Sequence, residues 1–66
     1  MEYLVDGLKR EIKFEIKSKM KLNDFLREIN ENRESVIVKI NDIIVTEFDY
    51  VSKGDKVELI KIASGG

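Results

Sequence analysis

Apolar and polar side chains alternate through the first part of the chain. Met1, Tyr3 and Val5 occupy every second position, and the pair Asp6-Gly7 that follows has the composition of a tight turn. Alternation resumes over residues 8–17, with the apolar positions Leu8, Ile12, Phe14 and Ile16. Because successive side chains of a strand point to opposite faces, this pattern predicts a hairpin whose second strand runs from residue 8 to residue 17 with one buried face.

The period changes after residue 18. Leu22, Phe25, Leu26 and Ile29 follow the spacing i, i+3, i+4, i+7. This spacing predicts an amphipathic helix over about residues 20–32 that covers the sheet. Ser18 is the nearest plausible N-cap, and Asn30 to Asn32 supply a polar stop.

The second half of the chain predicts three further strands. Val36, Val38 and Ile40 alternate along the first, and Asn41-Asp42 turns the chain into a short strand over residues 43–46. Gly54-Asp55 is a second turn signal, followed by a last strand over residues 56–62. We expect the two aromatic residues between these strands, Phe48 and Tyr50, to anchor their segment to the core edge.

The order strand, strand, helix, strand, strand, strand defines the fold class. Two strands separated by one helix favour a right-handed crossover, and one helix covers one face of a sheet. We therefore predict an α+β fold of the ubiquitin-like β-grasp type, a mixed four- to five-stranded sheet packed on one helix. Residues 1–62 form the β-grasp domain, and residues 63–66 form a flexible C-terminal Gly-Gly tail.

Composition excludes several classes of function. The 66 residues include 12 basic and 13 acidic side chains, so no excess of positive charge is present to hold a nucleic acid backbone. The longest apolar runs are only a few residues, so we expect neither a membrane span nor a secretory signal and place the protein in the cytoplasm. One compact domain is the size that this length allows.

Candidate chemistry is narrowed by the residue types that are missing. The sequence has no Cys and no His, which excludes disulfides, thiol nucleophiles, imidazole bases and the usual zinc ligands. It also has no glycine-rich phosphate-binding loop. We therefore expect a protein that is not an enzyme and binds no cofactor, so that any use of ATP belongs to a partner enzyme.

Three stretches resemble one family. Residues 38–45, VKINDIIV, resemble a V-x-x-N-G-x-x-V stretch with Asp42 where Gly is usual, and residues 53–60, KGDKVELI, resemble an x-G-D-x-V-x-x-x stretch that begins the last strand. The third is the C-terminal Gly65-Gly66. In this order and spacing they resemble the β-grasp sulfur-carrier family, the group of ThiS in thiamine biosynthesis and MoaD in molybdopterin biosynthesis.

The resemblance implies a chemistry for the end of the chain. A C-terminal carboxylate, with a reference pKa of about 3.3 to 3.7, is ionised at neutral pH and must be activated before it can be attacked. In the family an E1-like adenylyltransferase performs that step, and a sulfur donor such as a persulfide-bearing enzyme leaves a thiocarboxylate for an acceptor synthase. Gly66 is then the attachment site, and Ser64 and Gly65 form the leash.

Other functions fit the same tail. Gly-Gly ends also serve ubiquitin-like modifiers, in which Gly66 would be conjugated to lysines of other proteins. A frayed terminus on a β-grasp binding module is a third interpretation. Among carriers, the compact length favours the thiamine type, while the molybdopterin and tRNA-thiolation pathways stay open.

A docking surface is also predicted. If the strands alternate as described, Leu4, Ile37, Ile60 and Ile62 point away from the helix on neighbouring strands. Together they would form an apolar patch beside the tail, suited to docking the E1-like partner. Isolated exposed Ile and Leu residues are equally ordinary, so both interpretations stand at this point.

Overall fold

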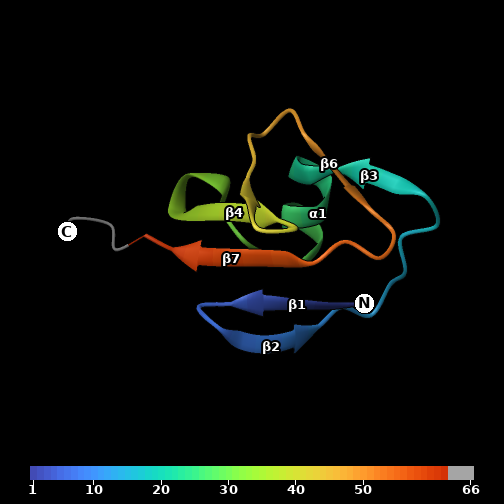
Figure 1. Cartoon of the computed structure of the whole chain (residues 1–66), viewed down its shortest axis with the longest axis horizontal. Helices are drawn as coiled ribbons and strands as arrows, with labels where there is room; N and C mark the ends of the chain where they lie inside the picture. The colour runs from blue at the N-terminus through green and yellow to red at the C-terminus, as the bar shows by residue number, and fades with distance from the viewer. Residues whose placement is uncertain (63–66) are drawn as a thin grey trace.

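The computed structural model describes residues 1–62. Figure 1 shows one sheet with a short helix on one face and a smaller pair of strands beside the helix. The elements of this part of the chain are β1 (Glu2–Val5), β2 (Leu8–Glu11), β3 (Lys19–Lys21), α1 (Leu22–Glu28), the 3-10 helix η1 (Arg33–Ser35), β4 (Val36–Ile40), β5 (Ile43–Ile44), β6 (Tyr50–Ser52) and β7 (Val57–Lys61).

Strand β7 lies at the centre of the main sheet. Within residues 1–62 the strand order is β2-β1-β7-β4-β5, with a separate two-stranded sheet of β3 and β6. The pair β1·β7 is parallel, whereas β1·β2, β4·β7 and β4·β5 are antiparallel. This mixed sheet packed on one helix confirms the predicted α+β, β-grasp fold.

The core lies between α1 and the inner face of the sheet. Phe25 at its centre is fully buried, and the edges of its ring meet the rings of Tyr3 and Phe14 at centroid distances of 6.0 and 6.4 Å. Leu22 and Leu26 complete the buried stripe of α1. The sheet contributes the inward residues Val36, Val38, Ile40, Val57 and Leu59. Alternation on β4 and β7 therefore gave the inner face correctly.

The second strand is shorter than predicted. β2 ends at Glu11, all of its side chains are exposed, and Leu8 is 64% exposed, so the prediction of a half-buried strand to residue 17 is wrong. β2 pairs only with β1, on the edge of the sheet. The last bond between these two segments joins the Ile12 N–H to Met1 O, just before β1, at 3.0 Å. Ile12 and Ile16 are buried although they lie in irregular chain after β2, and their spacing resembles the alternation of a strand.

The helix is also shorter at both ends. It begins after Lys21, which makes no side-chain capping bond, so the expectation of a Ser18 N-cap is wrong. Instead, the Leu22 N–H donates to Asp49 O at 3.0 Å, a contact from the segment before β6. Asn30, in the left-handed region at φ 59°, follows the last turn, as expected for a residue type that tolerates this conformation.

The region between β5 and β7 differs most from expectation. The predicted strand to residue 46 stops at Ile44, and an unpredicted strand, β6, pairs with β3. Phe48 is 82% exposed and Tyr50 is 46% exposed, so their expected role at the core edge is wrong. Val51 is the residue buried there. No helix among residues 1–62 is long and apolar enough to cross a membrane.

Candidate carrier site and docking face

The predicted attachment residue, Gly66, and the leash residues Ser64 and Gly65 lie outside the described residues. The same holds for the prediction that 63–66 form a separate tail. What the structure describes is the strand that leads to them. β7 runs to Lys61 and is followed by Ile62, at the end of the sheet that also carries the turn between β1 and β2 (Figure 1).

The end of β7 is held from three sides. On the β1 side, the Lys61 N–H donates to Asp6 Oδ1 at 2.9 Å. On the β4 side, the Ile62 N–H donates to Ser35 O at 2.9 Å. On the helix side, Lys61 Nζ pairs with Glu31 Oε1 at 3.6 Å. The chain up to Ile62 is therefore fixed on the body of the domain.

The predicted docking residues lie on the outer face, but not as one uniform patch. Ile37 and Ile60 are directly opposite each other on β4 and β7 and are 39% and 38% exposed. Ile62, 47% exposed, follows at the next outward position of the chain. Leu4 is half-buried and lies level with Glu58, one outward position before Ile60. The structure thus brings three of the four residues together and places a carboxylate beside the fourth.

A row of charged and apolar residues crosses this face beside the apolar patch. The register aligns one residue from each strand of the main sheet: Lys9, Leu4, Glu58, Lys39 and Ile44. Ile44, 66% exposed, was not among the predicted docking residues. Alternation along the predicted strand 43–46 could have identified it, because neighbouring residues of a strand point to opposite faces. The outer face is therefore apolar next to Ile62 and charged towards the other end of β7.

Lys56 adds to the charged part of the face. Its Nζ lies 3.4 Å from both Asp42 Oδ1 and Glu58 Oε1. The nearby negative charge of Asp42, together with the hydrogen bond to Glu58, raises the pKa of Lys56 above its usual value. The ammonium group is therefore charged at neutral pH and lies between the two carboxylates.

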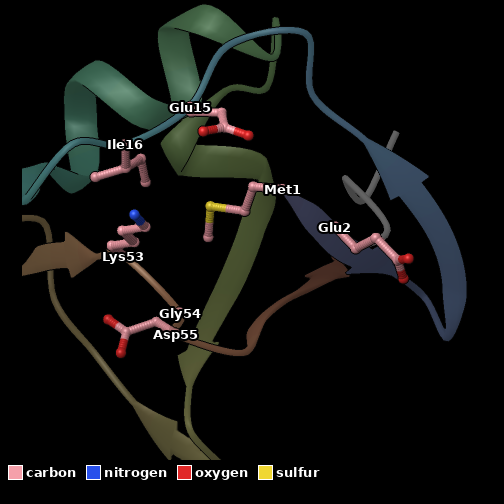
Figure 2. A pocket seen from close by; sticks show the side chains of 7 residues that line it. All are labelled: Met1, Glu2, Glu15, Ile16, Lys53, Gly54 and Asp55. Carbon is pink, nitrogen blue, oxygen red and sulfur yellow. The ribbon is translucent and has the colours of Figure 1, made fainter.

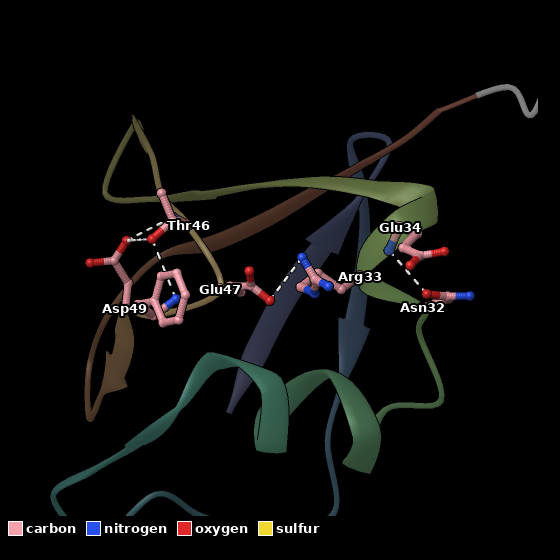
Figure 3. A network of polar contacts seen from close by, with 7 residues as sticks. Asn32, Arg33, Glu34, Thr46, Glu47 and Asp49 are labelled. Atoms are coloured by element: carbon pink, nitrogen blue, oxygen red, sulfur yellow. Dashed lines mark hydrogen bonds and ion pairs between the residues drawn. The ribbon is translucent and has the colours of Figure 1, made fainter.

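The loop after β5 presents an aromatic side chain. Asp49 Oδ2 accepts from the Thr46 N–H at 2.7 Å and from Thr46 Oγ1 at 3.2 Å, and Thr46 Oγ1 accepts from the Phe48 N–H at 3.3 Å (Figure 3). Glu47 of the same turn pairs with Arg33 Nη1 at 2.9 Å. These contacts close the turn locally, which leaves the ring of Phe48 facing solvent.

One surface hollow beside the N-terminus does not assemble reactive groups. It measures about 360 Å³ and is lined by Met1, Glu2, Glu15, Ile16, Lys53, Gly54 and Asp55 (Figure 2). The Asp55 carboxylate turns away from it and accepts from the Ser52 N–H at 2.8 Å. Across residues 1–62, no group of His, Cys, Asp or Glu is placed to hold a metal ion. We do not assign a site to this hollow.

The anchors of the strand end were not identified from the sequence. Asp6 was predicted only as a turn residue. Ser35 and Glu31 could not be identified, because the sequence does not distinguish a carbonyl or surface carboxylate that anchors a strand from any other. Asp6 lies in the β1–β2 turn, and the sequence alone does not indicate which strand end that turn will meet.

Fold and site together define a class. A small β-grasp domain fixes the chain up to Ile62 beside exposed apolar residues of β4 and β7. The ThiS family model matches residues 3–66. The chain belongs to the ThiS family of small sulfur-carrier proteins.

One solved structure supports the fold independently. The crystal structure of thiamine biosynthesis protein ThiS from Geobacter metallireducens is similar to this chain, with a TM-score of 0.64 and 24% sequence identity over 100% of both chains. At this identity the likeness concerns the fold. It agrees with the β-grasp arrangement described above.

Proposed function

We propose that this protein carries sulfur for thiamine biosynthesis as a thiocarboxylate on Gly66. The observation that carries the proposal is the family match, which continues through the strand end to residue 66. The similar structure from Geobacter metallireducens is that of a thiamine biosynthesis protein, which favours the thiamine pathway over molybdopterin synthesis or tRNA thiolation. The site of action is the cytoplasm.

The proposed chemistry has two stages. The Gly66 carboxylate attacks the α-phosphorus of ATP in an E1-like adenylyltransferase, which forms the acyl adenylate and releases pyrophosphate. The terminal sulfur of a partner's persulfide then attacks the carbonyl carbon, and AMP leaves with the bonding electron pair. A second thiol of the partner cleaves the resulting S–S bond, which leaves the thiocarboxylate on Gly66 and a disulfide on the partner.

The residues of this chain contribute position and docking. Since the sequence contains no Cys, the sulfur and every thiol come from partners, and ATP is bound by the adenylyltransferase. Glycine at positions 65 and 66 lets the backbone pass a narrow channel. The apolar pair Ile37 and Ile60, with Ile62, supplies the docking surface beside that end. An acceptor synthase finally receives the sulfur.

The test is the mass of the C-terminal peptide. Native protein is purified from its own cells and cleaved after Lys61, and the peptide 62–66 is weighed. The peptide is used because exchange of oxygen for sulfur nearly equals oxidation of Met1 or Met20 in the intact protein. A sulfur on Gly66 is expected. An unmodified peptide, with Gly-Gly remnants on lysines of other proteins, would instead identify a ubiquitin-like modifier.

The pathway is tested separately in cells. Deletion of the gene should create a requirement for thiamine that the wild-type chain relieves and a chain lacking Gly66 does not. Molybdenum-enzyme activity, measured in the same strains, should be unaffected. Loss of that activity with unchanged thiamine supply would assign the carrier to the molybdopterin pathway.

A further inference from the structure

We infer that Asp6 is a positioning residue for the chemistry at Gly66, because its carboxylate fixes the place and direction in which the chain leaves the sheet. The inference rests on the proposed function. Asp6 lies in the turn between β1 and β2, and its side chain accepts from the Lys61 N–H at 2.9 Å. The two residues are 55 positions apart in the sequence.

The turn itself does not require this side chain. Asp6 and Gly7 have φ values of 50° and 83°, so both lie in the left-handed region of a two-residue hairpin turn. Glycine or asparagine would serve at residue 6 equally well or better. The turn therefore leaves the carboxylate available for another interaction, and it accepts a hydrogen bond from β7.

The bond to Lys61 replaces a missing strand partner. The parallel register of β1 and β7 pairs Leu4 with Glu58 and Val5 with Leu59, and the Asp6 N–H donates to Leu59 O at 2.8 Å. After that bond β1 turns away towards β2. The Lys61 N–H, which faces β1, would then have no backbone partner, and Asp6 Oδ1 takes that place.

The opposite side of the strand is held in the same way. β4 begins at Val36, and the Ile62 N–H donates to Ser35 O, the residue just before that strand. Bonds from the two flanking elements thus extend the support of β7 beyond the paired residues, to Lys61 on the β1 side and to Ile62 on the β4 side. Removing the carboxylate acceptor of Asp6 would leave Lys61 without a bond on the β1 side.

This support limits the reach of the reacting end. Four residues follow Ile62, and fully extended they span at most about 14 Å. Without the Asp6 bond, only the pairing with β4 holds Lys61 and Ile62 on the sheet. Whenever that pairing also opens, the last fixed residue recedes from Ile62 to Ile60, and the number of residues from it to Gly66 rises from four to six. For a flexible segment the effective concentration of its end falls roughly as the −3/2 power of length, which is about a twofold loss. We expect the rate of sulfur loading to fall measurably, by up to this factor.

Three variants separate positioning from folding. Asp6→Gly keeps the left-handed turn but removes the acceptor, and Asp6→Asn restores an oxygen acceptor. Asp42→Gly is the matched control, because Asp42 is also an exposed aspartate in a left-handed hairpin position, at φ 67°, and makes no bond to the backbone of β7.

Two quantities are measured for each variant. Amide hydrogen exchange of Lys61 and Ile62 reports the support of the strand end, with Val38 and Val57 as core references. A pulse of isotopically heavy sulfate in growing cells gives the rate at which Gly66 acquires sulfur. Asp6→Gly should accelerate Lys61 exchange about fivefold, as loss of one hydrogen bond implies, and slow loading measurably, by up to about twofold. Asp6→Asn should restore both, and Asp42→Gly should change neither.

Several results would overturn the inference. Unchanged Lys61 exchange in Asp6→Gly, equal acceleration at Lys61 and at the core references, or normal loading despite faster local exchange would each show that Asp6 does not position the chain end. A wild-type chain that never acquires sulfur would refute the proposed function and, with it, this role. Exchange would then still decide whether Asp6 supports the end of β7.

Discussion

Asn41 and Asp55 bind each other across two turns that lie 14 residues apart in the sequence. Asn41 Nδ2 donates to Asp55 Oδ1 at 3.0 Å, and Asn41 Oδ1 accepts from the Lys56 N–H at 2.9 Å. Asp55 Oδ2 accepts from the Ser52 N–H at 2.8 Å. The Asn of the first resembling stretch and the Asp of the second therefore join the β4–β5 turn to the start of β7.

This relationship predicts the effect of Asn41→Ala. The substitution removes two hydrogen bonds and puts alanine at φ 53°, so we expect the free energy of unfolding to fall by about 2 to 3 kcal/mol. Asn41→Gly keeps the backbone conformation and should cost about half as much. Urea unfolding measures both values. Equal losses in the two variants would mean that the backbone conformation contributes nothing.

Asp55→Ala should behave as the partner of Asn41→Ala. Each single variant breaks the same Asn41–Asp55 bond, so their losses of stability should not add, and the double variant should fall short of the sum by about 0.5 to 1.5 kcal/mol. A double-mutant cycle by urea unfolding measures the coupling. Additive losses would show that the two turns are independently stable.

Replacing two phenylalanines by alanine should change stability to very different extents. Phe48 is 82% exposed, so Phe48→Ala should change the free energy of unfolding by less than about 0.5 kcal/mol. Phe25 is fully buried, and Phe25→Ala should cost about 3 to 5 kcal/mol, enough to unfold much of a domain this small. Thermal unfolding compares them directly. A large loss at Phe48 would contradict the exposed position of its ring.

The docking face predicts a loss of loading without a loss of folding. Ile37→Ser removes apolar surface beside Ile60 and should lower the rate of sulfur loading about tenfold, as expected when a residue near the centre of an interface is truncated. Ile43→Ser is the control, because Ile43 is also exposed but lies on the edge strand β5. Equal effects of the two variants would exclude a docking role specific to Ile37 and Ile60.

Lys56 predicts a pH dependence at the alkaline end. The negative charge of Asp42 and the hydrogen bond to Glu58 raise the pKa of Lys56 in the folded state, so its contribution to stability is fully present below the unfolded value of about 10.4 and is lost as the pH rises through the folded value. The melting temperatures of wild type and Lys56→Met should differ by a constant, small amount from neutral pH to about pH 10 and converge above it. A difference that persists at higher pH would assign the effect to packing of the Lys56 stem.

The sequence predicted those elements whose pattern reflects burial. Val36, Val38 and Ile40 alternate because β4 is paired on both sides and packed on one face, and the stripe of α1 follows its contact with the sheet. Family and fold could therefore be recognised from order and spacing.

Prediction failed where burial does not depend on secondary structure. Ile12 and Ile16 are buried although they lie in irregular chain, so their spacing looks like that of a strand. β3 is only three residues long and has two exposed lysines, so its pattern is too short to detect. Phe48 was misplaced because aromatic character alone does not report the turn of Thr46 and Asp49 that directs it outwards. The bond from Asp6 to Lys61 could not be predicted because it depends on where two strands end relative to each other.

The central position of β7 has a consequence for how the domain folds. The β1–β2 hairpin is local, but β1 finds its second neighbour only when β7 arrives from near the other end of the chain. Such non-local pairing slows folding relative to helical bundles of the same size. Bonds that join the ends of β7 to distant turns, at Asp6 and at Asn41, complete that late step. Substitutions there should accelerate unfolding while leaving the folding rate almost unchanged.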